Sequence, residues 1–152
     1  MIVFELCKSK FSNDLSGKEA ERSGGRWNSK GVPMVYTCAS RALCTVEIAV
    51  RTPLNNIPTD YELVTIILPD HSILELEISR LGPDWKSFPH SDITQKLGDE
   101  FVSNGLYLVM KVPSAIVQDE FNYLVNPNHV DFKKINIVSI EPFNLDNRLF
   151  KR

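Results

Sequence analysis

The sequence has no hydrophobic run long enough to cross a membrane. None of its apolar stretches approaches the roughly 18 residues that a membrane-spanning helix needs. The first residues, M-I-V-F-E-L, are typical of a strand and have neither the basic start nor the small-residue cleavage site of a signal peptide. Cys7, Cys38 and Cys44 are too few and too scattered for a disulfide framework, which predicts reduced thiols. We therefore expect a cytoplasmic protein without a membrane partner.

The common motifs for nucleotide and metal binding are also missing. Neither G-x-x-x-x-G-K-[ST] nor G-x-G-x-x-G occurs, so the sequence supports neither a P-loop nor a Rossmann nucleotide site. His71, His90 and His129 lie far apart and show no metal-ligand spacing with any cysteine, so we expect no metal site. The net charge of −2 is not that of a basic nucleic-acid-binding domain, so we expect no direct contact with nucleic acid.

Positive charge is nevertheless concentrated near the start of the chain. Residues 1–51 carry eight Lys and Arg side chains and five Asp and Glu side chains, although the whole chain has a net charge of −2. A locally basic segment with several glycines suits an anionic small ligand, and it suits a solvated loop equally well.

The most informative stretch covers residues 23–51. It begins with a glycine-rich turn that carries Arg26, continues with a short strand that ends near Tyr36, and finishes with a helix. Ser40 is a good N-cap for this helix, because its hydroxyl can accept from the free amides of the first turn. The helix is apolar nearly all the way round, so we expect it to be buried. Glu47 lies in its middle, where a carboxylate is costly without a partner or a ligand, and is therefore a candidate functional residue.

Glu47 also has a purely structural interpretation. Arg51 lies one helical turn further on, and ion pairs at this spacing are common, worth about 0.2–0.5 kcal/mol on an exposed helix. The pattern alone leaves the ion pair and a catalytic role equally open.

Strands outnumber helices and do not alternate with them regularly, which favours a single α+β domain, 1–152, with a compact mixed sheet and few helices. We expect strands at 2–6, 34–37, 61–68, 73–78, 106–112 and 135–140, and helices at 41–51 and 92–103. We expect 61–68 and 73–78 to form a hairpin or neighbouring strands, and 120–125 to be extended or helical. Segments 8–25 and 79–90 are expected to be irregular, with a loosely held tail from Asn144.

Four runs follow one another along nearly the whole chain. They are G-G-R-W-N-S-K-G-V-P-M-V-Y-T, A-L-C-T-V-E, L-Y-L-V-M-K-V-P-S-A-I-V and E-F-N-Y-L-V-N-P-N-H. With D-W at 84–85 and L-G-D at 97–99, this combination resembles the RES domain family, the toxins of RES–Xre type toxin–antitoxin pairs. The resemblance implies a fold similar to that of the diphtheria-toxin-like ADP-ribosyltransferases, and it implies NAD+ as the substrate.

The resemblance also implies the site residues. The Arg, Glu and Ser for which the family is named fall on Arg26, Glu47 and Ser114, and a family tyrosine falls on Tyr36. The implied activity is that of an NAD+-degrading toxin, a phosphorylase or glycohydrolase that cleaves the nicotinamide–ribose bond with phosphate or water as acceptor. A protein ADP-ribosyltransferase is one alternative, and a degenerate module that binds only its antitoxin or a nucleotide is another.

These residue types suit the implied chemistry. Cleavage passes through an oxocarbenium-like state, which Glu47 can stabilise while it holds the ribose hydroxyls. Arg26 can bind the pyrophosphate through bidentate hydrogen bonds, and Tyr36 can stack on the nicotinamide or bond the ribose. Ser114 can orient the substrate, or it can instead bond a turn amide after Pro113.

Two positions depart from the family pattern. Family members place an arginine in the first strand where this chain has Glu5, so one phosphate-binding group is missing or is replaced by Lys8 or Arg22. One turn after Glu47, where the family often has histidine, the chain has Arg51, which we include among the NAD+-binding residues.

The resemblance further implies a partner, an Xre-type helix-turn-helix antitoxin encoded beside the toxin, whose C-terminal part covers the active site. Contact with an operator would come from that partner. The sequence leaves the oligomeric state open, and a homodimer is one of the alternatives.

Overall fold

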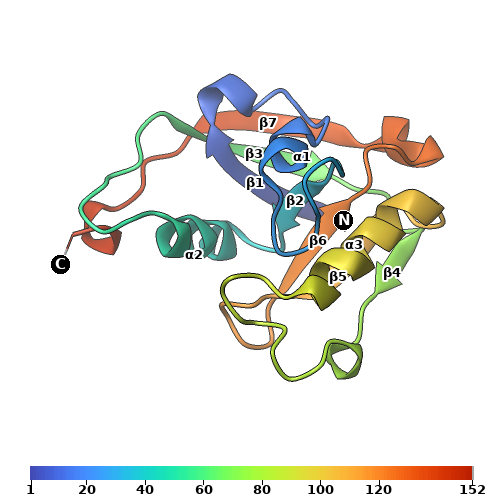
Figure 1. Ribbon diagram of the computed structural model, residues 1–152. Coiled ribbons are helices and arrows are strands. Elements are labelled where there is room, and N and C mark those ends of the chain that lie inside the picture. The colour runs from blue at the N-terminus through green and yellow to red at the C-terminus, as the bar shows by residue number, and fades with distance from the viewer. Residues whose placement is uncertain (152) are drawn as a thin grey trace.

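One mixed sheet of seven strands organises the computed structural model, which describes residues 1–151 (Figure 1). Strands β1 to β7 span Ile2–Lys8, Val35–Cys38, Tyr61–Ile67, Ile73–Glu75, Val109–Pro113, Phe121–Val125 and Asn136–Pro142. Their spatial order is β4-β5-β6-β2-β1-β3-β7, and neighbours are antiparallel except for the parallel pair β4 and β5. The predicted α+β fold with a mixed sheet is therefore confirmed.

Three α-helices and four short 3-10 helices accompany the sheet within the described range. Helices α1, α2 and α3 span Lys18–Ser23, Arg41–Arg51 and Asp92–Asn104, and η1 to η4 span Ser9–Phe11, Ile78–Arg80, Val130–Lys134 and Asn147–Leu149. Ser40 caps α2 as predicted, since its side chain accepts a hydrogen bond of 3.1 Å from the Leu43 amide. Gly105 ends α3 with a φ of 64°, a left-handed conformation that glycine adopts without strain.

The register of the sheet brings two predicted elements onto one face. Cys38 of β2 pairs with Phe4 of β1 on one side and with Asn122 of β6 on the other. Because side chains alternate between faces, Tyr36 lies on this same face. Phe4 packs in one core cluster with residues of α2, and Tyr36 packs in another with residues of α3. Helices α2 and α3 therefore both cover this face, each over its own part.

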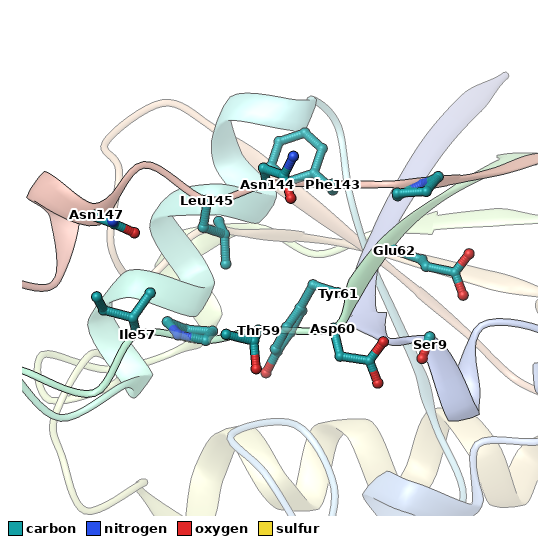
Figure 2. Close-up of a pocket in the computed structure, with 12 residues that line it drawn as sticks. Ser9, Ile57, Thr59, Asp60, Tyr61, Glu62, Phe143, Asn144, Leu145 and Asn147 are labelled. Atoms are coloured by element: carbon teal, nitrogen blue, oxygen red, sulfur yellow. The ribbon is translucent and has the colours of Figure 1, made fainter.

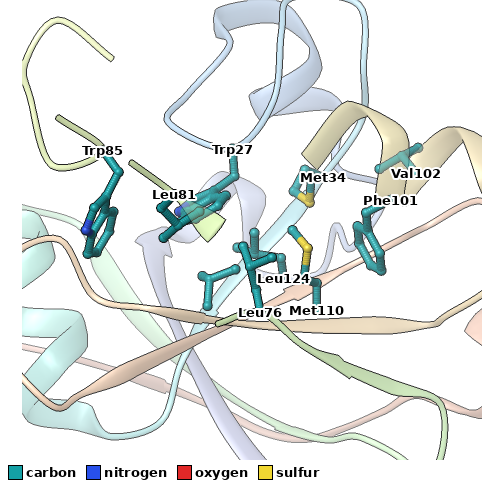
Figure 3. Close-up of a cluster of buried hydrophobic side chains, with 10 residues drawn as sticks. Trp27, Met34, Leu76, Leu81, Trp85, Phe101, Val102, Met110 and Leu124 are labelled. Carbon is teal, nitrogen blue, oxygen red and sulfur yellow. The ribbon is translucent and has the colours of Figure 1, made fainter. Parts of the chain in front are cut away.

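Figure 3 shows the cluster beneath α3, in which Trp27 and Trp85 lie with ring centroids 6.4 Å apart. Gly98 of α3 makes this packing possible, because a Cβ at this position would come within 1.6 Å of the Trp27 carbonyl oxygen. The helix backbone thus rests directly on the backbone of the segment that carries Arg26. This contact fixes the height of that segment above the sheet.

Helix α2 is not buried all round, contrary to the prediction. Its buried side chains are Leu43 and Cys44, whereas Ala42 is exposed and Val50 is 62% exposed. A single layer of helix covers the sheet here, so the outer side of α2 faces solvent even where its residues are apolar. Glu47 is consequently half-buried rather than enclosed.

The predicted pairing of the third and fourth strands was also wrong. β3 and β4 lie in opposite halves of the sheet, where β3 pairs with β1 and β7 and β4 pairs with β5. Apolar alternation identifies a strand but not its partner, which depends on the path of the intervening chain. Strand β4 ends at Glu75, and η2 occupies the end of the segment that we expected to be extended. The ambiguous segment 120–125 forms β6.

Two further segments are more ordered than the sequence indicated. The expected loop 8–25 contains η1 and α1, and α1 has no buried residue whose spacing could have revealed it. In the tail, Leu145 is 8% exposed and Phe150 is fully buried. The Phe150 carbonyl accepts a hydrogen bond of 2.6 Å from the Asn55 amide, so the tail is docked rather than loosely held. Nowhere in residues 1–151 is a helix both long and apolar enough to pass through a membrane.

Candidate active site

The carboxylate of Glu47 contacts the sheet through Asn122. Its Oε1 accepts a hydrogen bond of 3.0 Å from the Nδ2 of Asn122, which lies on β6. The Asn122 Oδ1 is buried and finds no hydrogen-bond partner among the described residues. One carboxylate oxygen is thus held by the protein, beside a buried acceptor that has no partner among the described residues. The sequence did not single out Asn122, because a lone asparagine in a strand gives no signal until the fold brings it to Glu47.

Arg26 lies near Glu47 although 21 positions separate them in the sequence. Its Nη1 donates to the carbonyl oxygens of Trp85 at 2.9 Å and Ser87 at 3.0 Å. Partial burial lowers the pKa of Arg26, and the nearby Glu47 carboxylate acts in the opposite direction. Arginine nevertheless stays charged at neutral pH. The structure therefore brings these two predicted site residues into one electrostatic environment.

Tyr36 supports the turn that carries Arg26. Its hydroxyl donates to the Oδ1 of Asn28 at 2.5 Å and accepts from the Trp27 amide at 3.1 Å. Burial raises the pKa of Tyr36, and the bond from Trp27 and the charges of Arg51 and Arg26 oppose the rise. The hydroxyl is thus occupied by protein groups, and the aromatic ring is the part that Tyr36 can offer to a ligand.

The glycine-rich turn before Arg26 is tightly held. The fully buried Asn28 donates to the Ala20 carbonyl at 2.8 Å, and its own carbonyl accepts from the Gly25 amide at 2.9 Å. A Cβ at Gly25 would lie 2.8 Å from the hydroxyl oxygen of Tyr36, so the turn has no room for a larger residue there. Glycine is therefore required for the close approach that positions Arg26.

Arg51 and His90 bring further charge and polarity to the site. The Arg51 Nε donates to the backbone carbonyl of Glu47 at 3.1 Å. The side-chain ion pair between the two, one of the two interpretations that the sequence left open, is not formed in the described chain. The Nδ1 of His90 is buried and lacks a hydrogen-bond partner among residues 1–151. Burial, reinforced by the charges of Arg26 and Arg51, lowers the pKa of His90. His90 is therefore a neutral imidazole close to both arginines.

Ser114 has the local role that the sequence left open. It is 3% exposed, and its Oγ accepts hydrogen bonds of 3.1 Å from the amides of both Ile116 and Val117. These bonds shape the turn between β5 and β6. The pair of Pro113 and Phe121 separates this turn from the pair of Val112 and Asn122. The hydrogen bonds found for Ser114 within residues 1–151 do not involve Arg26, Tyr36 or Glu47.

Glu5 cannot replace the arginine that the family places in the first strand. Glu5 is half-buried, and its Oε2 is buried without a hydrogen-bond partner in the described chain. Burial, together with the charges of Glu19 and Asp14, raises the pKa of Glu5 to about 8. The group is therefore mostly protonated at neutral pH. Lys8 and Arg22, the alternative phosphate-binding residues, are both exposed.

A pocket of about 630 Å³ lies beside this site, between the loop that leads into β3 and the tail after β7 (Figure 2). It is lined by residues 57–62, residues 142–145 and Asn147, together with Ser9. None of the predicted site residues lines it. Tyr61 forms part of its wall, and burial raises the pKa of Tyr61. The charge of Arg51 opposes this rise. Because Arg51 is the last residue of α2, the pocket lies near the end of that helix.

The described residues contain no group of three or more His, Cys, Asp and Glu side chains arranged to bind a metal. All three cysteines are free and buried. Burial raises the pKa of Cys7 to about 12, and contact with Cys38 raises that of Cys44. Both thiols are therefore protonated at neutral pH.

Comparisons with known proteins agree with this architecture. The family model described as "RES domain" matches residues 3–146. The chain is 39% identical over 155 residues to "Toxin Res" of Photorhabdus laumondii, in an alignment that covers 99% of this chain and 98% of the relative. It is 33% identical over 144 residues to "Prs ADP-ribosylating toxin" of a Sphingobium species, with 93% and 89% covered. A chain in the crystal structure of the M. tuberculosis MbcT–MbcA toxin–antitoxin complex has a similar fold, with a TM-score of 0.75 at 22% identity, over 98% of this chain and 86% of that one.

Proposed function

The chain belongs to the RES domain family, and from this premise we propose that it is the toxin of a bacterial toxin–antitoxin pair and cleaves the nicotinamide–ribose bond of NAD+. Phosphate or water accepts the ADP-ribosyl group. The observation that carries the proposal is the half-buried Glu47 carboxylate, bonded to Asn122 and within electrostatic range of Arg26.

Glu47 supplies the negative charge that the reaction needs. As the bond to nicotinamide breaks, its electron pair leaves with the ring, and positive charge develops on the anomeric carbon. A carboxylate held in place stabilises this charge without having to reorient during the reaction. Asn122 holds one carboxylate oxygen at 3.0 Å, and the other can accept a hydrogen bond from a ribose hydroxyl. An oxygen of phosphate or water then bonds to the anomeric carbon, and a proton is released from the attacking water.

Arg26 binds the pyrophosphate. The carbonyls of Trp85 and Ser87 engage its Nη1, which leaves the other guanidinium donors to face the phosphate oxygens. Arg51 adds positive charge from the exposed end of α2. Tyr36 presents its ring to the substrate, and its hydroxyl holds the turn that carries Arg26. Ser114 acts indirectly, because its hydroxyl shapes the turn between β5 and β6.

Release of nicotinamide tests the proposal. Purified protein is incubated with NAD+ in the presence and in the absence of phosphate, and free nicotinamide is measured over time. We expect release under at least one condition and its loss in Glu47→Gln. No release by the intact protein under either condition would contradict the proposal.

A protein ADP-ribosyltransferase is the second candidate, favoured by the relative whose name contains "ADP-ribosylating toxin". In that case the acceptor is a nucleophilic side chain of another protein, and turnover of NAD+ without that protein is slow. Incubation of a lysate with NAD+ labelled in the adenylate part distinguishes the two candidates. A labelled protein band that requires Glu47 supports the transferase, and free labelled ADP-ribose or its phosphate ester supports the first proposal.

We also propose that the partner is an antitoxin of the Xre type, encoded beside this chain. The likeness to a chain from a toxin–antitoxin complex supports a partner of this kind. Co-expression with the product of the neighbouring reading frame tests it. We expect a complex that copurifies and that releases less nicotinamide than the toxin alone.

A further inference from the structure

The loop between η2 and α3, residues 81–91, presents an aromatic ring to solvent. Phe88 is 84% exposed, the largest exposed fraction among the large apolar side chains of the described residues. Its ring packs edge-on against the imidazole of His90, with centroids 5.5 Å apart and planes at 85°. In Figure 1 this yellow-green loop, just before α3, curves toward α2. An exposed ring in such a place has no role in the core.

The loop is held in place beside the site. Trp85 anchors it in the core, and the Ser87 amide donates to the Asp84 carbonyl at 3.0 Å. The Ser87 hydroxyl donates to the Pro89 carbonyl at 3.2 Å. Arg26 binds the carbonyl that directly precedes Phe88. The ring of Phe88 is thus presented next to the guanidinium that binds the pyrophosphate.

His90 adds a polar group to the same surface. Its Nδ1 is buried and has no partner in the described part of the chain. Arg26 and Arg51 both lie close enough to help burial lower its pKa, so the imidazole is neutral. A neutral imidazole keeps one nitrogen as an acceptor, and because Nδ1 is buried, the nitrogen that accepts from a ligand is Nε2.

We propose that Phe88 and His90 bind the adenine of NAD+: the Phe88 ring stacks on the base, and His90 accepts a hydrogen bond from the exocyclic amine. This inference rests on the proposed function. Aromatic rings that stack on bases recur in proteins that bind single-stranded nucleic acids, and the contact requires only a π face.

The order of groups along NAD+ decides between its two rings. In the proposed reaction the nicotinamide riboside lies at Glu47, and Arg26 binds the pyrophosphate that follows it. The adenosine is attached to the other end of this pyrophosphate, so the surface next to Arg26 receives the adenine.

Three substrates separate the contacts. NAD+ carries the complete adenine, nicotinamide hypoxanthine dinucleotide has oxygen in place of the exocyclic amine, and nicotinamide mononucleotide has no base beyond the ribose phosphate. We expect Phe88→Ala to lower kcat/KM for NAD+ about tenfold and leave the mononucleotide unchanged. His90→Leu removes the preference for NAD+ over the hypoxanthine analogue. Leu106→Ala, which alters another exposed apolar side chain at 70% exposure, is the matched control.

A binding measurement separates this inference from the proposed function. Calorimetry with ADP-ribose is compared between the wild-type chain and Phe88→Ala. If the wild type binds ADP-ribose more tightly than Phe88→Ala but releases no nicotinamide, the proposed function fails and the adenine surface stands. Two results overturn the adenine surface in a chain that cleaves NAD+. In the first, Phe88→Ala changes neither kcat/KM nor the binding of ADP-ribose. In the second, Phe88→Ala lowers kcat/KM equally for NAD+ and for the mononucleotide. A wild-type chain that neither binds ADP-ribose nor cleaves NAD+ overturns both.

Discussion

Asn122 donates a 3.0 Å hydrogen bond to the carboxylate of Glu47 from 75 positions away in the sequence. The donor lies in the middle of the sheet, paired with Cys38 and Val112, so its position is set by the strand register. The acceptor lies on a helix that is only half covered. A rigid donor thus orients a carboxylate on a partly exposed element, and the proposed reaction depends on that orientation.

Loss of this donor should affect turnover more than binding. We expect Asn122→Ala to lower kcat for nicotinamide release about 100-fold with little change in KM, because the carboxylate is no longer directed at the anomeric carbon. Asn128→Ala, at an exposed position, is the control. Steady-state kinetics with NAD+ provide the measurement. Unchanged kcat in a folded Asn122→Ala would show that the bond has no catalytic consequence.

Neutralising the carboxylate should remove activity while preserving the fold. We expect Glu47→Gln to lower nicotinamide release at least about 100-fold, because the charge that stabilises the oxocarbenium-like state is lost. Expression without the antitoxin should arrest growth for the intact chain but not for this variant. Glu100→Gln, exposed on α3, should arrest growth normally. Harmless expression of the intact chain would instead support the degenerate binding module.

Arginine at position 26 should not be replaceable by lysine. We expect Arg26→Lys to raise KM for NAD+ about tenfold or more, because an ammonium cannot engage the Trp85 and Ser87 carbonyls and the pyrophosphate in one planar arrangement. Arg80→Lys, at an exposed position of η2, is the control. Kinetics over a range of NAD+ concentrations measure the effect. An unaltered KM would place the pyrophosphate elsewhere.

The buried carboxyl of Glu5 should make stability depend on pH. Burial raises its pKa from 4.5 to about 8. Below pH 4.5 the group is protonated in both the folded and the unfolded state, so it does not affect stability. As the pH rises from 4.5 to about 8, only the unfolded state loses the proton, and the folded state becomes progressively less stable. Glu5→Gln removes this penalty, which we expect to stabilise the variant by about 3 kcal/mol near pH 7. Urea unfolding of both proteins across this pH range, with exposed Glu77→Gln as control, measures the difference. A constant difference at all pH values would contradict the assignment.

Contact between α3 and the Arg26 segment should depend on Gly98. A Cβ there would overlap the Trp27 carbonyl oxygen, at 1.6 Å, so we expect Gly98→Ala to destabilise the fold by about 1–3 kcal/mol despite the higher helix propensity of alanine. Lys96→Ala, exposed on the same helix, should be nearly neutral. Thermal unfolding measures both. Equal stability of the two variants would mean that the helix moves away from the segment at little cost.

Several features of the fold could be predicted from short stretches of sequence. The Ser40 cap of α2 involves neighbours within a few residues, and it was predicted correctly. The partner of β4 could not be predicted in this way, because its pairing with β5 depends on the course of more than 30 intervening residues. The docked tail was missed for a similar reason. Leu145 and Phe150 are too widely spaced to form a pattern, and only their contacts with distant residues show that they are buried.

By itself the sequence determined the α+β class and the order of most elements, and its likeness to a family predicted a site of Arg26, Tyr36, Glu47 and Ser114. These depend on local propensity, apolar spacing and residue identity, which are properties of the linear chain. Only the tertiary structure decided that Glu47 is half-buried, that Asn122 holds it, and that Ser114 bonds its own turn. Burial and hydrogen bonding depend on which distant atoms become neighbours, and that is settled by the packing of helices on the sheet.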